Sequence, residues 1–114
     1  MRATYEVWMD RLGRIREPER YGWLESTHYD DLATARIVAH KYIDKKQPRL
    51  RIDILDSHDV IQESVLGNVP CFNGYGAVLD YKSNLVYGYN LSTGEYVNKI
   101  MIYNPEDDVL EDII

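Results

Sequence analysis

The sequence predicts an α+β domain in which a mostly antiparallel sheet carries one long helix on one face. Apolar residues recur at spacings of three and four between Leu32 and Ile43, the period of an α-helix. Apolar and charged residues then alternate from Arg49 to Ile54, the period of a strand. From Tyr75 onward, short apolar stretches are separated by turn residues, a pattern typical of consecutive antiparallel strands.

The long helix is expected to begin at Asp30 or Asp31, since either carboxylate can accept hydrogen bonds from the N–H groups of the first turn. Ala35 and Ala39 fall on its apolar face, and their small side chains would let the helix lie close to the sheet. Pro48 ends the helix, because proline cannot continue the hydrogen-bonding ladder.

Strands are expected on both sides of this helix. The turn formers at residues 56–59 predict a hairpin between the two strands that follow it. Because Asp53 and its charged neighbours alternate with apolar residues, one face of the sheet is expected to be solvated. The predicted order is β-β-α-β-β, with strands at residues 4–12, 21–27, 50–54 and 60–66.

The rest of the chain predicts a three-stranded meander at residues 75–81, 85–91 and 95–103. A short C-terminal helix is expected after it. Asn104 can cap that helix, Pro105 suits its first position, and three acids would fill its first turn.

Length and composition predict one domain over residues 1–114, because 114 residues are enough for one core and too few for two. No apolar run approaches the roughly 20 residues of a membrane span, and residues 1–10 lack the apolar core of a signal peptide. The single cysteine, Cys71, excludes an internal disulfide and is typical of a reducing compartment. We therefore expect a cytoplasmic protein without a membrane partner.

The net charge of −6 is unevenly distributed. Residues 1–51 carry eleven Lys and Arg against eight Asp and Glu, a net of +3. Residues 52–114 carry two Lys against eleven Asp and Glu, a net of −9. The second half would repel nucleic acid and attract a protein with a basic surface, although acidic surfaces also serve solubility. No direct nucleic-acid binding is expected.

Residues that could carry catalysis do not form a recognisable motif. His28, His40 and His58 each have acids nearby, but no metal-ligand spacing is present, so no metal and no cofactor are predicted. Cys71 follows a proline and precedes Phe72, which favours a buried structural thiol over a nucleophile. No catalytic residue is assigned, and the protein is expected not to be an enzyme.

Arginines cluster in the loop between the first two predicted strands. Clustered arginines can bind phosphate or carboxylate in bidentate fashion. Two glutamates are interleaved with them, so a solvated hairpin tip with local ion pairs is the favoured interpretation. The residues of this secondary basic loop are Arg11, Arg14, Arg16 and Arg20.

The tyrosine-rich meander is the best candidate recognition surface. Tyrosine offers a large contact area and a hydroxyl at low entropy cost, although it also packs well in half-buried sheets. The nearby acids are expected to form one contiguous negative face with these tyrosines. The predicted partner-binding residues are Tyr81, Tyr87, Tyr89, Tyr96, Asp80, Glu95, Glu106, Asp107 and Asp108.

In size, acidity and lack of motifs, the chain is similar to phage-encoded inhibitors of host defence, anti-CRISPR proteins among them, and to small bacterial immunity proteins. The likeness covers composition only. The predicted function is therefore a non-enzymatic protein-binding module that inhibits a nucleic-acid-binding or defence protein; a homodimer is also compatible with the sequence. Two alternatives stay open. One is a small-molecule or carbohydrate binder that uses tyrosine stacking. The other is a small enzyme that uses Cys71 or a histidine–carboxylate pair.

Overall fold

The computed structural model describes residues 5–10, 21–23, 29–43, 51–58, 60–67 and 69–113. Within these ranges, an antiparallel sheet and one helix make up an α+β structure, which confirms the predicted class. The elements are β1 (Glu6–Asp10), β2 (Tyr21–Trp23), α1 (Leu32–His40), β3 (Arg51–Leu55), β4 (Ile61–Leu66), β5 (Tyr75–Asp80), β6 (Leu85–Asn90), β7 (Tyr96–Asn104) and β8 (Val109–Asp112).

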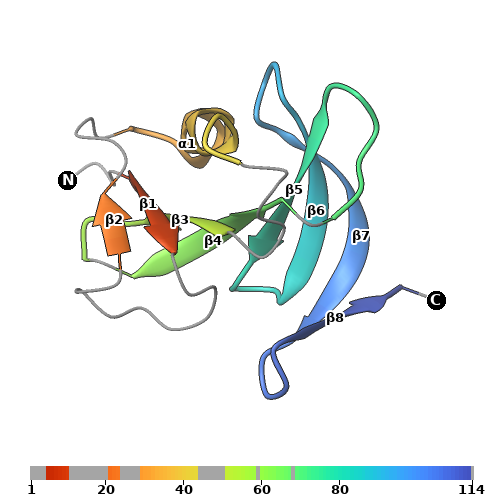
Figure 1. Cartoon of the computed structure of the whole chain (residues 1–114). Helices are drawn as coiled ribbons and strands as arrows, with labels where there is room; N and C mark the ends of the chain where they lie inside the picture. The colour runs from red at the N-terminus through yellow and green to blue at the C-terminus, as the bar shows by residue number, and fades with distance from the viewer. Residues whose placement is uncertain are drawn as a thin grey trace.

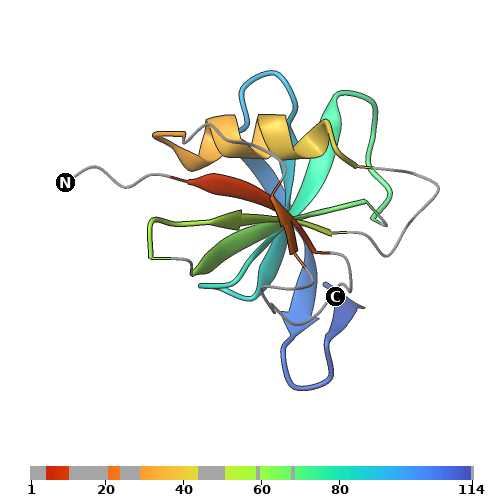
Figure 2. The same cartoon turned by 60° about the vertical axis from the view of Figure 1, so that its left-hand side comes forward.

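The described strands form one sheet in the order β2-β1-β3-β4-β5-β6-β7-β8, and each pairs antiparallel with its neighbours. From β3 onward, every strand lies beside the next strand of the chain, because each connection is a hairpin or a short loop (Figure 1). The register shifts within β3 and twice within β6. Such irregularities increase the local twist, and the strands fan out strongly when the molecule is turned (Figure 2).

Helix α1 lies across one face of this sheet (Figure 1). Asp31 is its N-cap, and the Asp31 carboxylate accepts a hydrogen bond from the Thr34 N–H at 2.7 Å. The helix ends at His40, earlier than the sequence predicts, and the expected end beyond residue 43 lies outside the described residues. Within the described ranges, no helix is long and apolar enough to cross a membrane.

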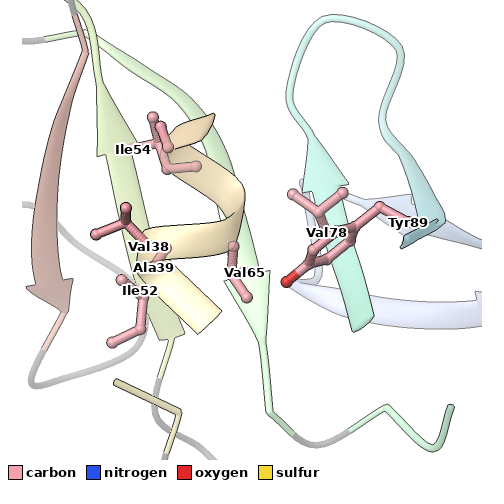
Figure 3. Close-up of a cluster of buried hydrophobic side chains, with 8 residues drawn as sticks. Val38, Ala39, Ile52, Ile54, Val65, Val78 and Tyr89 are labelled. Carbon is pink, nitrogen blue, oxygen red and sulfur yellow. The ribbon is translucent and has the colours of Figure 1, made fainter. Parts of the chain in front are cut away.

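The first core lies between α1 and the sheet. Ala35 and Ala39 are 0% exposed, which places the two alanines against the strands as predicted. Small side chains at these positions let the helix approach the sheet closely. Figure 3 shows the cluster, in which the buried members from the strands are Ile52, Ile54, Val65, Val78 and Tyr89.

A second core lies on the sheet face away from α1. Its buried members are Leu66, Ala77, Leu79 and Val86, and half-buried side chains from β7 and β8 pack against them. The Arg51 guanidinium of β3 lies 3.9 Å from the Asp108 carboxylate in the β7–β8 turn. Three strands separate β3 from β7 in the sheet order, so this contact requires the sheet to curl over its second face.

This curl overturns the prediction of a solvated face along β3. Asp53 and Ser64, whose side chains lie on this second face, are buried, although their residue types predict exposure. Asp53 accepts a 2.5 Å hydrogen bond from the Ser64 hydroxyl, and Ser64 is 2.7 Å from the Tyr81 hydroxyl. The alternation of residue types along β3 correctly assigns side chains to two sheet faces. One face is covered by α1 and the other by the curl of the sheet.

The predicted C-terminal helix is also wrong. Residues 105–108 form a turn, and Val109–Asp112 form strand β8, which pairs with Met101–Asn104. The Asn104 side chain accepts hydrogen bonds from the N–H groups of Glu106 and Asp107, so the expected capping residue closes a turn instead. Asp108 then adopts a φ of 53°, which interrupts any helix. One short helix is marginal by itself, whereas the strand gains pairing with β7.

Candidate functional site

A buried ion pair joins α1 to the sheet. The Arg36 guanidinium donates to both Glu63 carboxylate oxygens, with Nε–Oε1 at 2.6 Å and Nη2–Oε2 at 2.7 Å. Its Nη1 donates to the Gly94 carbonyl at 2.7 Å. Burial lowers the pKa of Arg36, but the Glu63 carboxylate outweighs this effect and the pKa is raised. One arginine therefore ties together α1, β4 and the β6–β7 loop.

Two of the predicted tyrosines complete this cluster. Tyr96 stacks on Tyr87 with ring centres 4.2 Å apart, and the Arg36 guanidinium lies 4.2 Å from the Tyr96 ring centre. The Tyr96 hydroxyl donates to Glu63. Burial and this contact with the carboxylate raise the pKa of Tyr96. These tyrosines brace the helix side of the sheet, and only part of Tyr96 remains exposed.

The other two predicted tyrosines are not surface anchors. Tyr89 is 0% exposed and lies in the first core (Figure 3). Its hydroxyl is 3.2 Å from His40 Nδ1. Tyr81 packs in the second core, and burial raises its pKa to about 12. Tyr81 and Tyr89 are therefore not exposed on the predicted partner surface, because the curled sheet and the helix cover the two sheet faces on which they lie.

The predicted acids do not form one contiguous face. Glu95 precedes β7, whereas Glu106, Asp107 and Asp108 follow its far end, so the nine extended residues of β7 separate them. Glu95, Glu106 and Asp107 are exposed. Asp108 is half-buried and accepts a hydrogen bond from Tyr103 at 2.8 Å. The remaining acid, Asp80, closes the β5–β6 turn by accepting from Lys82 N–H and from the Ser83 hydroxyl.

The secondary basic loop with Arg11, Arg14, Arg16 and Arg20 lies outside the described residues. Of the histidines, His40 contacts Tyr89, and His58 sits in the β3–β4 turn as predicted. There its N–H donates to Asp56 at 2.8 Å. The described residues contain no group of His, Cys, Asp and Glu side chains that could hold a metal ion.

The prediction that Cys71 is a buried thiol is wrong. Cys71 is exposed in the β4–β5 loop, and its sulfur lies 3.6 Å from the Val69 carbonyl oxygen. Cys71 and His40 both line a cavity of about 550 Å³. Partial burial raises the pKa of the Cys71 thiol, which is the opposite of the shift that activates a nucleophile.

The most conspicuous surface feature is an apolar patch that the sequence did not indicate. Phe72 is 88% exposed, and Val97 is 54% exposed. Together with Pro70 and Tyr75, which are also exposed, they line a second cavity of about 330 Å³. We call Pro70, Phe72, Tyr75 and Val97 the apolar patch. Phe72 lies in a turn-rich segment, and its sequence context does not distinguish it from a core residue. Its exposure is known only from the folded structure.

Comparison of the chain with models of protein families, with curated proteins and with solved structures gives no match.

Proposed function

We propose that the chain is a non-enzymatic protein-binding module and that the partner docks on the apolar patch. The observation that carries the proposal is the exposure of Phe72 and Val97 beside one cavity. Contiguous apolar side chains on a surface mark interaction sites more often than scattered ones. Burying one such side chain contributes about 1.5–3 kcal/mol, so a partner that covers the patch gains affinity from it.

The roles of the buried polar groups support binding over catalysis. Arg36 and Glu63 are saturated by each other and by neighbouring groups, and Asp53 is held by Ser64. These groups fasten α1 and the strands together. A rigid scaffold below an exposed apolar loop is a common arrangement for recognition, because the loop then keeps its shape without the partner.

The charge of the second half supports a basic partner. The exposed carboxylates of Glu106, Asp107, Glu111 and Asp112 lie in the β7–β8 hairpin, two in its turn and two in β8. A basic surface that normally holds nucleic acid would be attracted to them. We therefore also propose that the chain inhibits a nucleic-acid-binding or defence protein by occupying its basic surface.

A small-molecule or carbohydrate binder is the second candidate. The cavity of about 550 Å³ is within the size range of ligand pockets, and His40 and Asn73 bring polar groups to its lining. Most of the other lining residues are apolar or glycine. Saturation of the chain with a panel of mono- and disaccharides, followed by NMR, would reveal shifts at His40 if this candidate is right.

Affinity capture with a matched pair of variants tests the proposal. Phe72→Ser removes the centre of the patch, whereas Val60→Ser removes another exposed apolar side chain, 53% exposed, from the β3–β4 hairpin. Lysate from the source organism is passed over the wild-type chain and both variants, and bound proteins are identified by mass spectrometry. We expect a protein that the wild type and Val60→Ser retain and that Phe72→Ser loses. Equal retention by all three chains would refute the patch as the docking site.

A further inference from the structure

Strand β7 has an outer edge that β8 covers only in part. β7 spans Tyr96–Asn104, but β8 pairs with Met101–Asn104 alone. Among the described strands, none pairs with the outer edge of residues 96–100. An uncovered edge presents a row of backbone N–H and C=O groups, which is a template for an added strand.

The side chains on this edge are exposed rather than protected. Val97, Asn98 and Lys99 are exposed, Tyr96 is partly exposed, and the only charge among them is Lys99. Natural edges are usually blunted by several charges, by proline or by a covering segment. This edge instead carries an apolar side chain, Val97, that is 54% exposed. Such an edge favours association with another chain.

A cavity opens beside the same edge. Val97, Asn98 and Ile100 line the cavity of about 330 Å³ from β7, and Phe72 lines it from the β4–β5 loop. Gly88 of β6 also lines it, and an added Cβ there would come within 2.7 Å of the Asn98 side-chain oxygen. Glycine therefore leaves room for Asn98 to lie against the strand. The combination of open edge and adjoining pocket is the arrangement by which domains bind extended peptides.

Acids stand at both ends of the open segment. Glu95 precedes it directly, and Asp112 lies opposite Met101, at the point where an added strand would meet β8. Both residues are exposed. Apolar contacts in the middle and negative charges at the ends complement a segment with an apolar side chain flanked by lysine or arginine.

We propose that residues 96–100 of β7 accept an extended segment of a protein partner as an additional strand in line with β8. The segment places an apolar side chain in the cavity under Phe72 and basic side chains beside Glu95 and Asp112. This inference rests on the proposed function and names the docking mode. A second copy of the chain is a poorer occupant, because each copy has a net charge of −6 and acids at both ends of the edge.

The test uses a panel of short synthetic peptides in which lysine alternates with one apolar residue, chosen from valine, leucine, isoleucine, phenylalanine and tyrosine. Binding to the full chain is followed by NMR, with backbone amide shifts as the readout. We expect at least one peptide to shift the amides of residues 96–100. Methylation of alternate peptide nitrogens should abolish binding, because it removes the backbone donors. Panel members with glutamate in place of lysine should bind more weakly.

Val97→Ser should weaken the best peptide by about tenfold or more, the effect of truncating an anchoring side chain. Val60→Ser should leave its affinity unchanged, because the two valines are equally exposed but only Val97 is on the edge. Binding by none of the peptides, shifts confined to other residues, or indifference to nitrogen methylation would each overturn the inference. A concentration-dependent dimer that Val97→Ser dissolves would overturn it in favour of a second copy. If these tests fail while Phe72→Ser still abolishes affinity capture, the protein-binding function stands and only the docking mode falls.

Discussion

The Arg36 guanidinium meets the Glu63 carboxylate in two parallel hydrogen bonds, at 2.6 and 2.7 Å, in the buried layer between α1 and β4. Their value to stability depends on both partners being present. Removal of water from two charges is costly, and their mutual attraction offsets that cost only while the pair is intact. The Gly94 carbonyl accepts from Nη1 of the same guanidinium, which also lies over the Tyr96 ring.

Glu63→Gln should therefore destabilise the fold on the order of 3–5 kcal/mol, because it leaves the Arg36 charge buried without its counter-ion. Chemical denaturation at neutral pH measures this change. The double variant Arg36→Met with Glu63→Leu is the control, since it removes both charges together and should cost much less than Glu63→Gln alone. A double variant as unstable as the single one would contradict this account of the pair.

Gly94 is expected to be the least replaceable glycine of the described loops. Its φ is +76°, and an added Cβ would lie 2.1 Å from the Ala33 carbonyl oxygen on α1. Gly74 has a φ of +87° but no atom within 4 Å of an added Cβ. Gly74→Ala should cost about 1–2 kcal/mol, the strain of the left-handed conformation. Gly94→Ala should cost clearly more, because the loop must also move away from the helix. Equal melting temperatures for the two variants would show that the loop does not pack against α1 in solution.

Ala39→Leu tests the close approach of α1 to the sheet. Ala39 is 0% exposed and belongs to the first core, so added methylene groups meet packed atoms. Overpacking of this kind costs about 1–3 kcal/mol. Lys41→Leu is the control, because Lys41 is exposed just past the end of the helix and its replacement should change the unfolding free energy little. An unchanged denaturation midpoint for Ala39→Leu would mean that another face of α1 contacts the strands.

The tyrosines predict a loss of stability in alkaline solution. Burial raises the pKa of Tyr81 from 10.0 to about 12. The protonated phenol is favoured in the folded chain, so the contribution to stability is complete below pH 10 and is lost as the pH rises toward 12. For Tyr81 this contribution corresponds to about 2–3 kcal/mol. The pKa values of Tyr89, Tyr96 and Tyr103 are raised as well, which adds to the same trend.

Denaturation midpoints measured between neutral pH and pH 12, with phenolate absorbance recorded in parallel, check this prediction. Tyr81→Phe should have a shallower decline than the wild type, since it lacks one of the titrating groups. Tyr75→Phe is the control, because Tyr75 lies exposed on the apolar patch. A steeper decline in Tyr81→Phe would contradict the assignment of the burial effect to this residue.

Much of the fold follows from periodicity, and several of the errors share one cause. Alternation places Tyr87 and Tyr89 on one face of β6, and both side chains do lie on the face that α1 covers. What local sequence does not contain is the curl of the sheet. Only this curl brings Asp108 to Arg51 and buries Asp53, whose charge predicts exposure. The same curl makes Tyr81 a core residue.

The C-terminal segment shows a second limit of sequence reasoning. Asn104 and Pro105 are as suitable for a turn as for the start of a helix, because both structures use a side chain that accepts from nearby N–H groups. The choice between them depends on the free edge of β7, which is a tertiary feature. The apolar patch also depends on tertiary structure. Phe72 carries no sign in the sequence that it remains exposed beside Val97.

The last prediction concerns the rate at which a basic partner associates. Glu106 and Asp107 are exposed at the tip of the β7–β8 hairpin, whereas Asp108 is held by Tyr103. Glu106→Lys with Asp107→Lys should therefore slow association with the captured partner and leave the melting temperature nearly unchanged. The wild-type rate should fall as salt rises past roughly 0.15 M, where the screening length is about 8 Å. Lys82→Glu is the opposite-sign control, because it adds negative charge to the β5–β6 turn. That turn contacts the end of β7, where the Tyr103 N–H donates to the Asn84 carbonyl. Lys82→Glu should accelerate association. Stopped-flow measurements over a salt series give all three rates, and a partner that binds equally fast to each chain at every salt concentration would exclude electrostatic steering by this hairpin.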